Sequence, residues 1–316
     1  MARDHYVPQF YLRNFRIPRK PGLVYLYRRG KPAREISIRK VAHEEDYYDL
    51  KRDDPEVDKD AIDRLLGLSE NHTAPIIARL LSASSPNLTN EEIGYLSWFA
   101  GLLGSRTPAI RETIASIHLG IGRREFKKLL SEDAEFEEMK KRHSDMTEEQ
   151  LKEVRKAFLN GEIYMDFKRG GETEDFLMSQ QLQFAEILVN ILQSRDWVLM
   201  ETASSLSFLA SDNPVINMPL PDHPRDETWG YANGNILMPI SPKRALLFVS
   251  RELGFNGVRI RKGVLQVQRQ RMPELQFYII TQCKSAVYSH VLSNEFQRVL
   301  NSTEEGKAQT ATVPGA

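Results

Sequence analysis

The chain has a single cysteine, Cys283, among 316 residues. One thiol excludes an internal disulfide and any metal site built from several thiolates. Its neighbours Tyr278, Ile279, Ile280 and Ala286 are typical of one face of a helix. We therefore expect a buried, unreactive thiol.

Long hydrophobic runs are also missing. The longest ones, at 236–240 and 245–249, fall far short of the roughly 20 residues that cross a bilayer. We therefore expect no membrane span. No apolar run of secretory length follows the first basic residues, which predicts a cytoplasmic protein.

The common motifs for metals and nucleotides are absent from the sequence. It contains no His-x-x-x-His, no Cys-x-x-Cys and no carboxylates at EF-hand spacing. Glu70 and His72 are two residues apart on a predicted helix, so they point in different directions. The segment Gly101-Leu102-Leu103-Gly104 lacks the Lys-Ser/Thr pair of a Walker loop. ATP hydrolysis of the common kind is not expected, and the cofactor stays unknown.

The net charge is zero, but the charges are unevenly distributed. Residues 1–40 contain eleven Lys or Arg and two acids, a net charge of plus nine. Residues 41–63 contain ten acids and three bases, a net charge of minus seven. Either the two blocks neutralise each other within the fold, or the first block faces phosphates.

Hydrophobic periodicity divides the chain into three parts. Alternating residues predict a β-hairpin over 23–42, and spacings of three and four predict helices over about 59–193. Short apolar runs from 195 onward predict strands, followed by helices from Pro273 to about Ser289 and from Asn294 to Leu300.

This order of elements predicts an α+β fold with an N-terminal β-hairpin, a helical middle and a C-terminal, mostly antiparallel sheet with closing helices. We expect the hairpin to join the later sheet. Residues 1–302 would form a single domain, with a helical subdomain at 59–193 and a sheet-rich part at 23–42 plus 195–302. The tail, 303–316, has no apolar periodicity and should be disordered.

The most distinctive stretch is the opening segment, His5 to Phe15. It is too apolar and too aromatic to be a free terminus, so it should be docked into the fold. We expect its apolar residues to form the anchor: Val7, Pro8, Phe10, Leu12 and Phe15.

The same stretch carries a family resemblance. It resembles a widespread family of microbial and viral domains of unknown function, whose members open with His-x-Val-Pro-x-x-Tyr-Leu-x-x-Phe. Further similar segments are Glu70, 106–108, 211–214, 239–242 and 286–289, where the last is expected to end a helix. The family has no settled activity, so the resemblance leaves the function open.

The resemblance groups polar residues that are distant in sequence, and we expect them to converge in one pocket. The residues assigned to catalysis are His5, Glu70, Arg106, Asp212 and Asn213. Those assigned to substrate binding are Tyr11, Arg13 and Ser211. Such a pocket would suit a hydrolase or transferase with a phosphorylated or nucleotide-like substrate, with His5 as acid or base and Arg106 stabilising negative charge. Asp212 is the place where a divalent metal could bind.

Two alternatives stay open. The same residues could form a structural polar network in a non-catalytic binding module. The chain could also be a nucleic-acid-binding or nuclease component of a phage conflict system, which would use the first basic block and a later group of basic residues. That later group comprises Arg259, Arg261, Lys262, Arg269 and Arg271, with each pair of alternating Arg residues expected on one strand face. The oligomeric state is not determined by these patterns.

Overall fold

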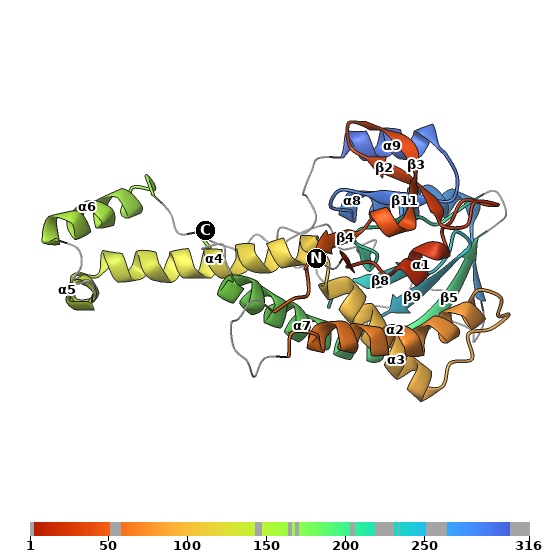
Figure 1. Ribbon diagram of the computed structural model, residues 1–316, viewed down its shortest axis with the longest axis horizontal. Helices are drawn as coiled ribbons and strands as arrows, with labels where there is room; N and C mark the ends of the chain where they lie inside the picture. The colour runs from red at the N-terminus through yellow and green to blue at the C-terminus, as the bar shows by residue number, and fades with distance from the viewer. Residues whose placement is uncertain are drawn as a thin grey trace.

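The helices and strands follow one another in the predicted three-part order, and the fold class is α+β as expected. Figure 1 shows them in the computed structural model of the chain. The structure describes residues 3–50, 58–142, 147–163, 166–167, 171–202, 206–218, 231–232, 234–250 and 264–303.

Strands occur mainly at the two ends of the chain. Their bounds are β1 Arg3–His5, β2 Leu23–Arg28, β3 Lys31–Ser37, β4 His43–Glu45, β5 Asp196–Thr202, β6 Ala210–Ser211, β7 Ile216–Met218, β8 Asn235–Pro239, β9 Arg244–Val249, β10 Val264–Val267 and β11 Val287–Ser289.

Helices fill the middle and close the C-terminal part. Their bounds are α1 Gln9–Arg13, α2 Ala61–Leu80, α3 Asn90–Ser105, α4 Pro108–Ser131, α5 Asp133–Arg142, α6 Glu148–Leu159, α7 Gly171–Gln193, α8 Met272–Gln282 and α9 Asn294–Ser302, with short 3₁₀ turns η1 Ile38–Lys40 and η2 Arg269–Arg271. None of the helices in the described part of the chain combines the length and the apolar character that a membrane span needs.

The predicted hairpin is present and belongs to a four-stranded antiparallel sheet. Strands β2 and β3 are joined at Gly30, whose φ of 66° suits a residue without a Cβ. Strand β11 lies on the other side of β2 and also pairs with β6, so the order is β3-β2-β11-β6. The hairpin therefore joins strands from the C-terminal part of the chain, as expected, in a sheet separate from the larger one.

The larger sheet is the centre of the fold. Its order is β10-β5-β9-β8-β7, and every pair is antiparallel except β10 with β5. Successive side chains of a strand point to opposite faces. Accordingly, Leu246 and Phe248 of β9 pack into the cluster shared with α2, α3 and α7, whereas Leu247 and Val249 pack into the cluster shared with α8 and α9. Both faces of the sheet are thus covered by helices.

Helices α3 and α7 pack closely because α3 carries glycine at the contact. A Cβ on Gly101 would lie 2.7 Å from the Cγ2 of Val189 and 2.8 Å from the carbonyl oxygen of Ala185. Gly104 lies equally close to Leu188. Gly101 and Gly104, which do not belong to a Walker loop, therefore allow the two helices to pack closely.

The charged middle of the chain forms an arm. Figure 1 shows α4 projecting from the body with α5 and α6 at its far end. A small apolar cluster of Leu130, Phe136 and Leu151 joins the three helices there.

Two predictions about the C-terminal part were wrong. The helix predicted to reach about Ser289 ends at Gln282, and Val287–Ser289 is strand β11, because this segment is paired on both sides by β2 and β6. Arg269 and Arg271 lie in the 3₁₀ turn η2 rather than on a strand face. The predicted tail from 304 and the residues Arg259, Arg261 and Lys262 lie outside the described residues.

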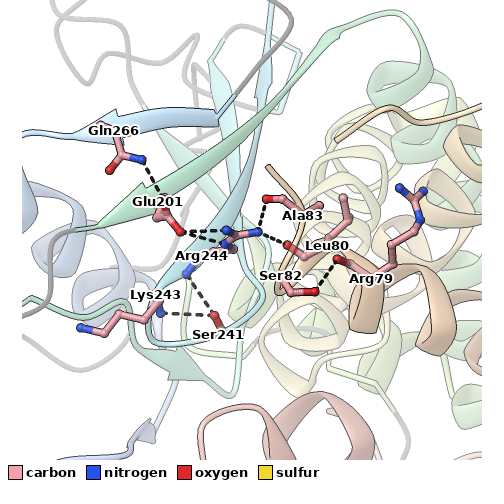
Figure 2. Close-up of polar contacts among 9 residues, drawn as sticks. All are labelled: Arg79, Leu80, Ser82, Ala83, Glu201, Ser241, Lys243, Arg244 and Gln266. Carbon is pink, nitrogen blue, oxygen red and sulfur yellow. Dashed lines mark hydrogen bonds and ion pairs between the residues drawn. The ribbon is translucent and has the colours of Figure 1, made fainter. Parts of the chain in front are cut away.

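A buried arginine joins the helical layer to the large sheet, as Figure 2 shows. Nη1 of Arg244 donates to the carbonyl oxygens of Leu80 and Ala83, at 2.6 Å each, where α2 ends. Its Nη2 and Nε lie 2.8 and 3.2 Å from Oε1 of Glu201. Gln266 donates to the other carboxylate oxygen at 2.7 Å. Hydrogen bonds from Gln266 and Arg244 lower the pKa of Glu201. One side chain thus connects α2, β5 and β9.

Replacing Arg244 by Met should lower the free energy of unfolding by about 2–4 kcal/mol, because Glu201 and two carbonyls lose their donor. Urea denaturation measures the loss. Arg271→Met is the matched control, since Arg271 forms an exposed pair with Glu274, and it should cost less than about 0.5 kcal/mol. Equal losses in the two variants would contradict this role of Arg244.

Candidate functional site

The opening segment is docked into the larger hydrophobic cluster, as predicted. Val7, Leu12 and Phe15 are fully buried, and Phe10 packs against the cluster. The hydroxyl of Tyr11 donates to the carbonyl oxygen of Pro239 at the end of β8. The segment therefore connects the N-terminus to the large sheet.

Strand β1 fixes the start of this segment against β4. Oδ2 of the buried Asp4 accepts a hydrogen bond from the backbone N–H of Tyr48 at 3.1 Å. The Tyr48 hydroxyl returns a bond of 3.2 Å to the carbonyl oxygen of His5. Two hydrogen bonds thus join Tyr48, which follows β4, to residues of β1.

Arg106 and Glu70, two of the predicted catalytic residues, are in direct contact. Nη2 of Arg106 lies 3.0 Å from Oε1 of Glu70, and its Nε donates to the carbonyl oxygen of Tyr6 at 3.0 Å. Arg106 is 4% exposed, whereas Glu70 is half-buried. The anion that Arg106 reaches in the structure is thus Glu70.

Asp212 accepts hydrogen bonds from the loop that follows α8. Oδ1 accepts from the N–H of Lys284 at 2.9 Å. Oδ2 accepts from the N–H and Oγ of Ser285, at 2.7 and 2.8 Å, and from the N–H of Ala286 at 2.9 Å. Burial raises the pKa of Asp212, and these hydrogen bonds act in the opposite direction. Both carboxylate oxygens are occupied by donors of the chain itself.

Ser211 and Asn213 belong to the same group. The hydroxyl of Ser211 donates to the carbonyl oxygen of Asn213 at 2.6 Å, and Nδ2 of Asn213 donates to the carbonyl oxygen of Gln282 at 3.0 Å. Oδ1 of Asn213 is buried without a partner in the described part of the chain. Next to this loop the thiol of Cys283 is buried, as expected, and burial raises its pKa.

His5 lies opposite His43 across the β1–β4 pair, with ring centroids 5.3 Å apart. Nε2 of His5 and Nδ1 of His43 are buried without hydrogen-bond partners in the described residues. Burial lowers the pKa of His5, and the neighbouring His43 lowers it further. The imidazole of His5 is therefore held in its neutral form.

The predicted substrate-binding residues do not form one group. Tyr11 is fully buried and its hydroxyl is used by Pro239. Arg13 is exposed, and Ser211 is part of the Asp212 loop.

Tyr6 lies between the Arg106 pair and the Asp212 loop. Its carbonyl oxygen accepts the bond from Arg106, while its side chain is influenced by Asp212. Burial raises the pKa of Tyr6, and the charge of Asp212 is the next largest cause. The two groups of predicted residues are thus connected through one residue of the opening segment.

A family model described as "Protein of unknown function (DUF4238)" matches residues 3–291. The chain belongs to this family. The matched span runs from β1 through β11, so it includes every residue discussed above. Neither the search of curated proteins nor that of solved structures found a match.

In this DUF4238 chain, two residues that were not among the candidate site residues, Arg28 and Tyr288, lie on the paired strands β2 and β11. Tyr288 is the cross-strand partner of Leu26 and of Ala210. The pairing of β2 with β3 is irregular between Leu26 and Arg28, and Asp212 follows the end of β6. The charges of Arg28 and Asp212 both act on Tyr288. We call these residues with Tyr6 the Arg28 face: Tyr6, Arg28, Asp212 and Tyr288.

The charges of Asp212 and Arg28 act on both tyrosines of the Arg28 face. Burial is the main cause that raises the pKa of both tyrosines, Asp212 raises it further, and Arg28 lowers it. Neither tyrosine hydroxyl has a hydrogen-bond partner among the described residues. Two patterns point to these positions: Tyr6 lies inside the opening motif, and Tyr288 lies in the segment 286–289.

The described residues hold no group of three or more His, Cys, Asp or Glu side chains suited to a metal ion. At Asp212 in particular, four donors already occupy the carboxylate.

Asp212→Asn should lower the free energy of unfolding by about 2–4 kcal/mol, since an amide group would place its own N–H against donors that need an acceptor. Urea denaturation measures this loss. Ser285→Ala is the control, because it removes one of four donors from an exposed residue and should cost about 1 kcal/mol. An unchanged stability of Asp212→Asn would show that the network is not structural.

Stability should decrease as the pH falls below about 6.5. The pKa of His5 is lower in the folded state than in the unfolded chain, so the unfolded chain binds more protons in this window. The slope from one such group is at most about 1.4 kcal/mol per pH unit. His5→Gln should flatten the profile measured by urea denaturation, and adding His290→Gln should flatten it further, since burial also lowers the pKa of His290. A profile that His5→Gln does not alter would refute this.

Proposed function

We propose that the chain is a binding module for a phosphate-bearing ligand, held at the Arg28 face. Among the described residues, Arg28 is the one half-buried Lys or Arg side chain for which no hydrogen bond or ion pair is found. Its Nε is fully buried and unpartnered. A buried polar group without a partner costs free energy, and a bound anion would remove this cost.

The neighbours of Arg28 suit the same ligand. Burial keeps Tyr6 and Tyr288 protonated at neutral pH, because it raises the pKa of each. A protonated hydroxyl is a hydrogen-bond donor, and a guanidinium offers several donors in the planar arrangement that phosphate oxygens accept. Two free hydroxyls beside a free guanidinium therefore favour an anion with several acceptor oxygens.

The remaining polar residues support a structural role. The Asp212 carboxylate accepts four hydrogen bonds from the chain, so it is not free to act as a base. The guanidinium of Arg106 is divided between Glu70 and the carbonyl of Tyr6, so it is not free to stabilise a substrate charge. The hydrogen bonds of Asp212 and Arg106 are thus satisfied within the chain, and this network positions the Arg28 face.

Because Asp212 is not free to act as the general base, a hydrolase or transferase would need another residue in that role. The neutral imidazole of His5 could accept a proton, and its lowered pKa is the observation in favour of that activity. Turnover is therefore a measurable alternative to binding alone.

Isothermal titration with a nucleoside 5′-monophosphate and with inorganic phosphate should detect binding. Arg28→Gln should weaken it about tenfold or more, since a charge-assisted hydrogen bond to phosphate contributes about 1.5–3 kcal/mol. Tyr6→Phe and Tyr288→Phe should each weaken it about fivefold. Arg124→Gln is the matched control, because Arg124 is an exposed residue of α4, in the arm.

Two results would contradict the proposal. Equal affinity of Arg28→Gln and Arg124→Gln would exclude Arg28 as the phosphate contact. Release of inorganic phosphate from the nucleotide, if abolished by His5→Gln, would show that the chain is an enzyme rather than a binding module.

A further inference from the structure

Exposed cations lie close together where the opening segment meets the first hairpin. Residues 13–40 contain ten Lys or Arg and one acid, Glu35, which is paired with Lys20 at 2.6 Å. Five exposed cations form what we call the basic surface: Arg13, Arg16, Arg19, Arg39 and Lys40.

Three short elements bring these residues together. Arg13 ends α1, which packs against η1, where Arg39 and Lys40 lie. The turn that carries Arg19 is held beside them, because the N–H of Ile38 donates to the carbonyl oxygen of Gly22 at 2.9 Å. Cations that are distant in sequence therefore form a continuous exposed group.

No member of the basic surface has an acidic partner among the described residues. The acidic block that follows it in sequence thus does not neutralise it through ion pairs in the described part of the chain. The α4–α6 arm, which is equally rich in charge, differs. There Arg155 pairs with Asp133, and Lys140 and Lys152 both pair with Glu148. The five cations near α1 and η1 thus have no ion-pair partner among the described residues, whereas several cations of the arm do.

The composition of the surface indicates the partner. Four of the five cations are arginine, whose planar guanidinium binds phosphate oxygens in pairs. An anionic membrane would also attract the charge, but stable insertion needs apolar side chains beside it. None of the exposed large hydrophobic residues of the described chain lies in α1, in the turn before β2 or in η1. Phosphates of a nucleic acid therefore fit this surface better than a lipid headgroup layer does.

We infer that the basic surface binds the sugar-phosphate backbone of a nucleic acid, without reading its sequence. Binding of this kind comes from neutralising phosphates and releasing counterions. It does not depend on Arg28, which is half-buried at the end of β2 and is not a member of the basic surface.

Fluorescence anisotropy with a labelled single strand of about 20 nucleotides tests this, with salt varied from about 50 to about 200 mM. Five phosphate contacts on a single strand predict a slope of log K against log salt of about −3.5. The triple variant Arg13→Gln, Arg39→Gln, Lys40→Gln should bind about tenfold or more weakly at low salt, with a slope near about −1.5.

The matched control removes the same charge from the arm. Arg124→Gln, Lys127→Gln, Lys128→Gln changes three exposed residues of α4 and should bind within about twofold of the unaltered chain. Urea denaturation of both triple variants confirms that they are folded. Arg28→Gln should keep the full slope, so failure of the phosphate site and failure of the basic surface are distinguishable.

Three outcomes would overturn the inference. The first is binding that does not weaken with salt, and the second is an equal loss in the arm control. The third is tighter binding to polyglutamate or to vesicles containing phosphatidylserine than to the strand, which would assign the surface to an acidic protein or a membrane.

Discussion

The hydrogen bonds that Asp212 accepts are the constraint on which the rest of the structure depends. They fix residues 284–286 directly after α8, and strand β11 begins at the next residue. Because β11 lies between β2 and β6, it is the strand that joins the N-terminal hairpin to the C-terminal part. A buried carboxylate is costly without donors, so this loop and this side chain stabilise each other.

Buried hydrogen bonds also hold the opening segment in place. Arg106 donates to the carbonyl of Tyr6, and Tyr11 donates to the carbonyl of Pro239, so backbone groups of distant segments are satisfied by buried side chains. Tyr6 is thereby placed over the sheet face that carries Arg28 and Tyr288. The proposed ligand site is thus adjacent to the structural network and shares Asp212 and Tyr6 with it.

Features that depend on neighbouring residues were predictable. The capping box of Thr89 and Glu92 has both reciprocal bonds, at 3.0 and 3.2 Å, and Pro108 begins α4 behind the cap of Thr107. The burial of the opening segment was predictable from its apolar and aromatic residues. The contact of Arg106 with Glu70 places two predicted site residues together, although as an ion pair. By contrast, Val287–Ser289 has a local sequence compatible with the end of a helix, and only its partners β2 and β6 make it a strand.

The sequence is enough to predict the α+β class, the three-part order and the docking of residues 5–15, because these follow from periodicity, caps and apolar content within short windows. Tertiary structure alone decided that Asp212 is saturated by its own chain, that Arg28 is left without a partner, and that five cations from α1, a turn and η1 share one surface. Each of these depends on pairing between segments that are far apart in sequence, and no local pattern encodes such pairing.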